Sequence, residues 1–493
     1  MHLRTNLVIS VVFAGLLAFV YFHEIKGGEK RELEAERARQ LVDFSDHEAR
    51  RLTIDGGDTT LVIERADDVW YIREPLQTGA DAEAVDRFLR SLKEAEIEGD
   101  AVQDSTSITQ DSSILAVYGL DEPRLQVHLE LAESAEQILD TLRFGADTPT
   151  ERFTYVQRSG ANPEIRTVRA WRYDNLAKGL FDLRDRKVLH FDKSEIVGMR
   201  LAFREGDLDR LIVAERREER WALTSPLAVA GDDAAFDEIL TRLGNAQIVS
   251  FEYEEPTTAD LKVAGLSDGD ETVHLTLLVD ADRAEKHLRL GKRYEQGDHL
   301  AIDTSRDPIF VIDSTVVIQL KKKLDDLRDR KPFDIAPESV LGIDLTVANQ
   351  TLFRAMKDSS GSGWHLTSNP DREAKTWRLN DLLTSVADLR VESFVADAPD
   401  VLSLDVVSFG FDQPALRLAL HLGVGETIFV EVAEHEGTVY ARRADVPSIY
   451  AVAETALTDL APTLDDVAMA PQQATADQDA ATEVTLAPGN SGS

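Results

Sequence analysis

Histidine is the residue type whose placement in this chain most suggests chemistry, because imidazole binds metals and exchanges protons near neutral pH. His128 and His274 occupy the same position of two similar segments, and His421 stands two residues off in a third. Apolar residues alternate around His128, which predicts a strand that buries Leu125 and turns the histidine outward. We therefore interpret the histidines as solvent-facing residues of separate domains, and we predict no metal site and no catalytic residue.

A second candidate is the string Leu-Arg-Asp-Arg-Lys, which occurs twice and ends at Lys187 and at Lys331. An arginine fork binds a carboxylate through two parallel hydrogen bonds, so the strings suit the docking of an acidic partner. Both strings also lie at the end of a predicted helix and directly before the next domain, where they can join neighbouring domains. We predict an interdomain clamp, which comprises Arg184, Asp185, Arg186, Arg328, Asp329 and Arg330.

Composition excludes several classes of function. The chain of 493 residues has no cysteine, which rules out disulfides, thiolate zinc sites, iron–sulfur clusters and cysteine nucleophiles. Acidic residues outnumber Lys and Arg by 90 to 54, and the net charge of −36 disfavours nucleic-acid binding, which needs clustered cations. The sequence signatures of P-loop, zinc-protease and serine-hydrolase sites are absent. We expect a protein that is not an enzyme, with no cofactor and no nucleic-acid partner.

Internal similarity divides most of the chain into three copies. Residues 187–201 align without a gap on 331–345, and a fainter copy opens at 41–54. The recurrent positions are Trp70, Trp221 and Trp364, and then Gly119, Gly265 and Gly410. Recurrence at one position of every copy is typical of core residues and structural turns rather than of a site that stacks a ligand.

Each tryptophan block leads into an amphipathic helix and then into further strands. The apolar stripe of the first helix is Ala84, Val85, Phe88, Leu89 and Leu92, and the same spacing recurs in the other copies. Runs of strands with helices at one side predict α+β domains with mostly antiparallel sheets. We expect three tandem domains, each with its own core, at residues 41–187, 188–331 and 332–462.

The uncharged apolar run at residues 7–22 predicts a membrane contact. Its sixteen residues span about 24 Å as a helix, and flanking side chains can extend it toward the bilayer thickness. A cleavable signal peptide is the alternative, but small residues suited to cleavage do not follow the run. We predict an uncleaved transmembrane signal anchor within residues 1–22, which contacts the lipid bilayer through 7–22, and a helical stalk at 23–40.

The orientation in the membrane and the disorder of the carboxyl-terminal tail are both predicted from composition. Residues 23–40 hold five Lys or Arg and five Glu, so the positive-inside rule does not favour an external C-terminal part. The very short amino-terminal tail and the absence of cysteine favour export of the bulk of the chain. Residues 463–493 hold five acids and no Lys or Arg, which predicts a disordered acidic tail.

The combination of an apolar N-terminal run and recurrent copies resembles the domain of unknown function 4340 family. The shared pattern is an apolar N-terminal helix followed by copies with a Trp-x-[Leu/Ile]-x-x-Pro block, a helix, a Gly-[Leu/Phe]-x-x-Pro turn and the Leu-Arg-Asp-Arg-Lys string. The resemblance implies a bacterial, membrane-anchored protein that accompanies ABC-transporter components of the gliding-motility or auxiliary type, and it supplies no catalytic residues. The chain departs from the pattern at Ser267-Asp268-Gly269, and its third copy lacks the Arg-Asp-Arg string.

Three hypotheses of function follow. The leading one is a non-catalytic accessory protein of the bacterial inner membrane, with periplasmic domains that bind a transporter or another complex of the cell envelope. The second is a module that binds an envelope glycan or peptide, which requires a concave pocket with convergent polar groups. The third and remotest is a hydrolase.

Overall fold

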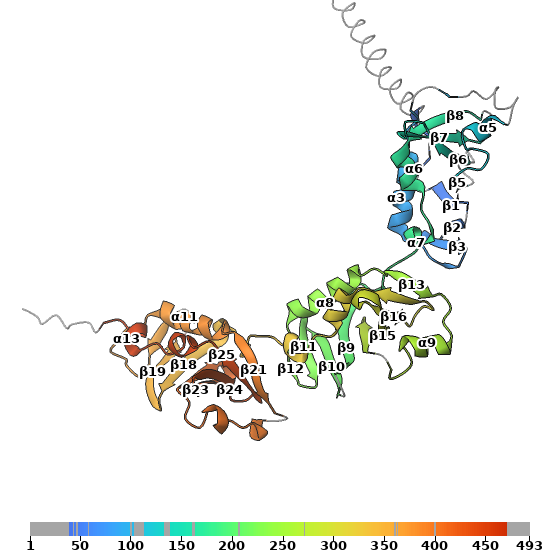
Figure 1. The fold of residues 1–493 in the computed structure, drawn as a ribbon. Coiled ribbons are helices and arrows are strands. Elements are labelled where there is room, and N and C mark those ends of the chain that lie inside the picture. The colour runs from blue at the N-terminus through green and yellow to red at the C-terminus, as the bar shows by residue number, and fades with distance from the viewer. Residues whose placement is uncertain are drawn as a thin grey trace, which may run out of the picture. The chain divides into compact units, whose positions relative to one another are not determined.

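The computed structural model describes residues 39–470, with gaps at 43, 46–47, 58, 99–100, 103–112, 133–138, 160–162, 206–207, 271, 359–360, 362 and 399–400. The chain divides into two compact units at Arg186–Lys187. The first unit contains one β-sheet, and the second contains two (Figure 1). All the strand pairs of the three sheets are antiparallel in the described residues, so the predicted α+β class with antiparallel sheets is confirmed.

The first domain is an eight-stranded sheet in the order β4-β3-β2-β1-β5-β6-β7-β8. Its first strand is central, because β5 returns to pair with β1 after the helix. Residues after that helix pair with the edge strand β8, where Glu98 N donates to Thr167 O at 2.8 Å. The elements are β1 (Ala49–Asp55), β2 (Thr60–Ala66), β3 (Val69–Glu74), β4 (Thr78–Gly79), α3 (Ala82–Lys93), α5 (Ile114–Val117), β5 (Leu125–Leu131), β6 (Leu139–Asp147), β7 (Phe153–Arg158), β8 (Ile165–Arg169), α6 (Ala170–Leu176) and α7 (Leu180–Leu183).

The second domain repeats this topology, and its sheet has the order β12-β11-β10-β9-β14-β15-β16-β17-β13. The strand after the long helix, β13, forms the far edge. The elements are β9 (Ile196–Glu205), β10 (Leu208–Arg217), β11 (Arg220–Ser225), β12 (Val229–Ala230), α8 (Asp233–Asn245), β13 (Ser250–Tyr253), α9 (Thr258–Ala264), β14 (Val273–Val279), β15 (Ala284–Arg293), β16 (His299–Asp303), β17 (Ile309–Ile312), α10 (Ser314–Leu320) and the 3₁₀ turn η5 (Leu324–Asp326).

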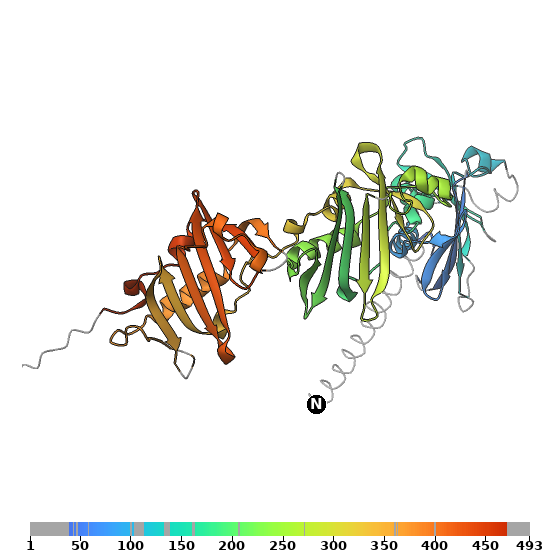
Figure 2. The same cartoon turned by 90° about the horizontal axis from the view of Figure 1, so that it is seen from below.

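The third domain has the sheet order β20-β19-β18-β22-β23-β24-β25-β21, again with its first strand in the middle. Figure 2 shows its antiparallel strands from a second direction. The elements are β18 (Val340–Val347), β19 (Gln350–Lys357), β20 (Trp364–Leu366), α11 (Thr376–Ala387), β21 (Val391–Asp397), η7 (Val401–Ser403), η8 (Val407–Phe409), β22 (Leu416–Leu422), β23 (Thr427–His435), β24 (Thr438–Arg443), β25 (Ser448–Val452), α12 (Ala456–Asp459) and α13 (Leu464–Val467).

Each domain has its own hydrophobic core between the long helix and one face of its sheet (Figure 1). The predicted helical stripes are confirmed, since every apolar residue of the stripe on α3 is buried. Asp81 and Asp232 cap α3 and α8 as expected, with their side chains accepting from backbone N–H groups of the first turn. The spacing of apolar residues therefore determines which side of each helix faces the sheet.

A smaller apolar cluster lies apart from the main core in each domain. In the second domain Leu266 and Ile309 pack there beside α9. The turn after α9 contains Gly265 with φ of +69°, and Gly119 and Gly410 have φ of +62° and +79° in the other copies. Only glycine adopts this left-handed conformation without steric cost, which explains why the turn residue recurs.

The end of the third domain differs from the sequence-based prediction. Residues 463–470 belong to the folded domain rather than to a tail, because α13 places Val467 and Ala468 in the third core with exposures of 0% and 1%. Thr463 caps α13 by accepting a hydrogen bond from Asp466 N. The rest of the predicted tail, and the predicted anchor and stalk up to residue 38, lie outside the described residues.

Candidate functional site

The Arg-Asp-Arg strings are extended segments, which corrects the prediction that they end a helix. The backbone of Arg184 has φ of −77° and ψ of 145°, because α7 stops at Leu183. Asp81 N donates to Leu183 O at 2.9 Å, and Asp185 N donates to Gly79 O at 3.0 Å. The first string therefore adds a short antiparallel bridge to the edge of its own domain, beside β4.

The second and third copies repeat this bridge. Asp232 N donates to Leu327 O at 2.9 Å, and Asp329 N donates to Ala230 O at 3.0 Å. In the third copy the corresponding bridge is formed by Ala468. The backbone position is thus the same in all three domains, whereas the arginine side chain is present only in the first two.

Arg328 is the centre of the second string and extends to the third sheet. Its guanidinium donates to both carboxylate oxygens of Asp397, at 2.8 and 3.1 Å, and lies 3.8 Å from the ring centroid of Phe394. Ser448 Oγ completes the cluster by donating to Asp397 at 2.6 Å. Arg328 is only 2% exposed, so this ion pair is shielded from water on the arginine side.

The next residue of the string, Asp329, forms its ion pair with the second domain rather than with the third. Arg220 of β11 lies 3.4 Å from Asp329 and 3.1 Å from Asp334, both in the connection between the second and third sheets. It also lies 3.7 Å from Asp233 at the start of α8. The hydrogen bond with Asp334 is the main cause of a pKa of Arg220 above its ordinary value, so this cation stays charged among three carboxylates.

The backbone of the string also pairs with the third sheet. Val391 N, at the start of β21, donates to Arg330 O at 2.9 Å. The guanidinium of Arg330 makes only long contacts of 3.4 Å to the carbonyls of Val391 and Glu392. Residues 327–331 therefore bridge to the second sheet through Leu327 and to the third through Arg330, a connection that resists bending better than a free linker.

The geometry brings together only part of the predicted clamp. Arg328, Asp329 and Arg330 meet partners that the sequence analysis missed, above all Asp397 and Phe394. A signal for them existed, since Ser393-Phe394 repeats the pair Ser250-Phe251 of the second copy. The clamp role of Arg184, Asp185 and Arg186 stays a prediction.

The repeat tryptophans lie in the domain cores rather than at a surface. Trp70 and Trp221 are each 3% exposed and Trp364 is 7% exposed. Trp221 stacks on Phe236 of α8 with ring centroids 4.6 Å apart, and Trp364 donates its indole N–H to Asn380 at 3.0 Å. These positions join the third strand of each copy to its long helix.

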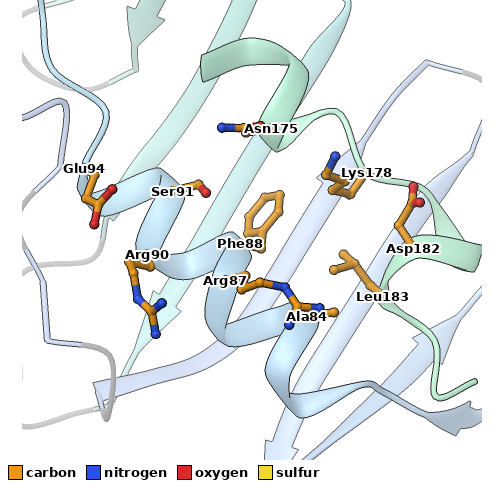
Figure 3. A pocket seen from close by; sticks show the side chains of 10 residues that line it. All are labelled: Ala84, Arg87, Phe88, Arg90, Ser91, Glu94, Asn175, Lys178, Asp182 and Leu183. Carbon is orange, nitrogen blue, oxygen red and sulfur yellow. The ribbon is translucent and has the colours of Figure 1, made fainter. Parts of the chain in front are cut away.

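A surface groove of about 350 Å³ lies beside α3 in the first domain (Figure 3). Its polar side chains are largely engaged with neighbours: Asp182 accepts from Gly179 N at 2.9 Å, and Lys178 donates to Asp174 O at 3.2 Å. Glu94 lies 3.5 Å from Arg172. The groove therefore lacks the convergent polar groups that a specific ligand site needs.

Within the part of the chain that the structure describes, no three His, Asp or Glu side chains converge to hold a metal ion. The histidines do lie on the sheet face away from the long helix: buried residues alternate around His128 in β5, and His274 is the one partly exposed residue of β14. They are not simply solvated: His128 and His421 lie 3.4 and 3.1 Å from hydroxyls of Thr141 and Thr427 on the neighbouring strands.

The fold and this connection define a class of protein: tandem α+β repeats joined by a bridged connector. The chain belongs to the family described as Domain of unknown function (DUF4340), whose model matches residues 70–269 and 221–406. The two matches begin at Trp70 and Trp221, the same position of successive copies. No curated protein and no solved structure matches the chain.

Proposed function

We propose that this protein is a non-catalytic accessory subunit of a bacterial inner-membrane complex, with an ABC transporter as the partner. Residues 7–22 anchor it in the bilayer, and the repeat domains lie on the periplasmic side, where they bind the partner. Among the described residues, no helix is long and apolar enough to cross a membrane, so the anchor rests on the sequence of residues 7–22.

The connection between the second and third sheets is the observation that carries this proposal. Arg328 is buried against Asp397, while Asp329 is held by Arg220 of the second domain. Such an arrangement fixes the spacing of two domains, which supports a scaffold role.

The sheet faces opposite the long helices are suited to contact a partner. Leu211 on β10 and Phe429 on β23 are 50% and 43% exposed there, among ion pairs such as that of Arg200 and Glu285 at 2.7 Å. Non-obligate protein interfaces combine apolar contacts with a polar rim, and these faces offer side chains of both kinds. We propose these faces as the partner-binding surface.

The anchor leads to the first prediction. If residues 7–22 are retained in the bilayer, the mature protein begins at or near Met1 and remains with membranes after high-salt and carbonate washes. Fractionation and N-terminal sequencing of the protein from its native cells measure this. A soluble species that begins near residues 23–30 would contradict the anchor and leave the other parts of the proposal to be judged separately.

The partner surface leads to the second prediction. A photoreactive amino acid at Leu211 or at Phe429 should give a discrete adduct with an integral-membrane protein in living cells. Trp377 on α11 is the matched control, since its side chain is 59% exposed but lies on the helical layer. Mass spectrometry identifies the adduct, and loss of the adduct on deletion of the transporter genes assigns it. Equal adducts at Trp377, or none at either sheet position, would refute the proposed surface.

A further inference from the structure

Two histidines face each other on the open face of the second sheet. His274 Nε2, on β14, lies 3.3 Å from Nδ1 of His287, on β15. Their ring centroids are 5.3 Å apart, and the ring planes differ by 50°. The side chain of His287 is 29% exposed, so the pair is open to solutes.

A carboxylate orients the second imidazole. Glu285 Oε2 lies 3.4 Å from Nε2 of His287, on the side away from His274, and Arg200 holds Glu285 at 2.7 Å. We therefore assign the proton of neutral His287 to Nε2, which leaves the lone pair of Nδ1 directed at His274. A carboxylate behind an imidazole is the usual outer partner of a metal-binding histidine, because it fixes the tautomer and raises the basicity of the ligand.

The spacing of the two nitrogens fits a shared metal ion. With metal–nitrogen bonds of about 2.0–2.1 Å and tetrahedral angles, two imidazole ligands have their nitrogens about 3.3 Å apart. The observed separation is 3.3 Å, the length of a hydrogen bond between the two imidazoles, which a bound metal ion would replace. The hydroxyl of Thr276 lies 3.1 Å from Nδ1 of His287. Metal binding requires this hydroxyl to turn away from Nδ1, which a rotating hydroxyl does at little cost.

Charges around the pair do not oppose a cation. Arg289 stands directly across from His274 in the strand register, but its guanidinium pairs with Asp268 at 2.7 Å. Arg200 is paired with Glu285, and the neighbour of His274 on β9 is the small residue Ala202. Arg289 and Arg200 are thus each matched by a carboxylate.

We propose that His274 and His287 form a two-imidazole site for a late first-row divalent metal ion, such as Cu²⁺, Ni²⁺ or Zn²⁺. Imidazole selects these ions over Mg²⁺ and Ca²⁺, which prefer oxygen ligands. Two protein ligands leave the other coordination positions to water or to a side chain of a bound partner. The site is independent of the proposed accessory function.

The first domain supplies a natural comparison. His128 occupies the position of His274, and the residue thirteen places after it is Thr141, where the second domain has His287. The first sheet therefore has one imidazole beside a hydroxyl, and the second has two imidazoles. The first domain also has Leu139 where the second has Glu285. The site can therefore be removed in the second domain, and a weaker one can be introduced in the first.

The test is a metal titration of the full-length chain without a histidine tag. Calorimetry with Zn²⁺ and electron paramagnetic resonance with Cu²⁺ should show one saturable site that is lost in His274→Ala and in His287→Thr. The resonance spectrum should show coupling to two imidazole nitrogens. Glu285→Ala should weaken binding about tenfold, because the orienting carboxylate is gone.

Control variants decide between this site and background binding. His128→Ala should retain the site, and Thr141→His should add a second, weaker one in the first domain. Binding by the amino terminus or by scattered side chains is common to all variants and cancels in the comparison. Equal stoichiometry and affinity in the original chain and in His287→Thr would overturn the proposal, as would equally tight binding of Mg²⁺. Circular dichroism verifies that each variant is folded.

Discussion

Replacing Trp221 with alanine should lower the free energy of unfolding of the second domain by about 4 kcal/mol, the cost of removing a buried indole and leaving a cavity. The ring is 3% exposed and stacks on Phe236, so its contacts join β11 to α8. Hydrogen exchange followed by mass spectrometry on the full chain measures the effect peptide by peptide. The loss of protection should be confined to residues of the second domain, because each domain has a separate core.

Trp377→Ala is the matched control, since this tryptophan is 59% exposed and should change stability by less than about 0.5 kcal/mol. A conservative Trp221→Phe variant should recover part of the stability lost in Trp221→Ala. If Trp221→Ala left the stability unchanged and abolished binding of a partner, the interpretation of the repeat tryptophans as core residues would be wrong.

Replacing Arg328 with alanine should destabilise the third domain and its connection by about 3 kcal/mol. The substitution removes a buried cation from Asp397 and leaves the ring of Phe394 without its packed guanidinium. The estimate is at the low end for buried ion pairs because the carboxylate side chain is 33% exposed. Urea unfolding followed by circular dichroism measures the loss, and spin labels on the second and third domains should show a broader distance distribution.

Arg330→Ala serves as the control for Arg328→Ala. Its guanidinium contacts only two carbonyl oxygens at 3.4 Å, while the hydrogen bond from Val391 N uses the backbone of Arg330 and survives the substitution. We expect a change below about 1 kcal/mol and an unaltered distance distribution. If Arg328→Ala kept the distances and instead lost binding to the membrane partner, the string would be a docking site rather than a clamp.

Local patterns in the sequence were sufficient for the long helices, most of the core residues and the recurrent glycine turn. The stripe from Ala84 to Leu92 predicts the buried face of α3, because residues three and four apart lie on one side of any helix. Trp221 and Gly265 recur at one position of every copy, which identifies both as structural residues. Comparing the copies along the chain is enough to find them. The family was recognised from the same short motifs.

Pairing between residues far apart in the sequence determines the conformation of the Arg-Asp-Arg strings and the neighbours of the histidines. Arg328 was predicted to end a helix, but hydrogen bonds to residues about a hundred positions earlier make the segment extended. Its partner Asp397 follows 69 residues later, and carboxylates are so frequent in this acidic chain that no pattern could select it. The sequence pattern correctly predicts that His274 faces outward. Only the register of β14 against β15 places His287 beside it.

The sequence by itself therefore determined the α+β class, the repeated order of elements and most of the residues that fill each core, since these depend on periodicity within one element and on recurrence along the chain. The tertiary structure alone decided that residues 463–470 complete the third core, that residues 327–331 bridge two sheets, and that two imidazoles meet on one of them. Those features depend on which strands become neighbours and in what register. A shift of one residue would turn every such side chain to the opposite face, and no local pattern reports it.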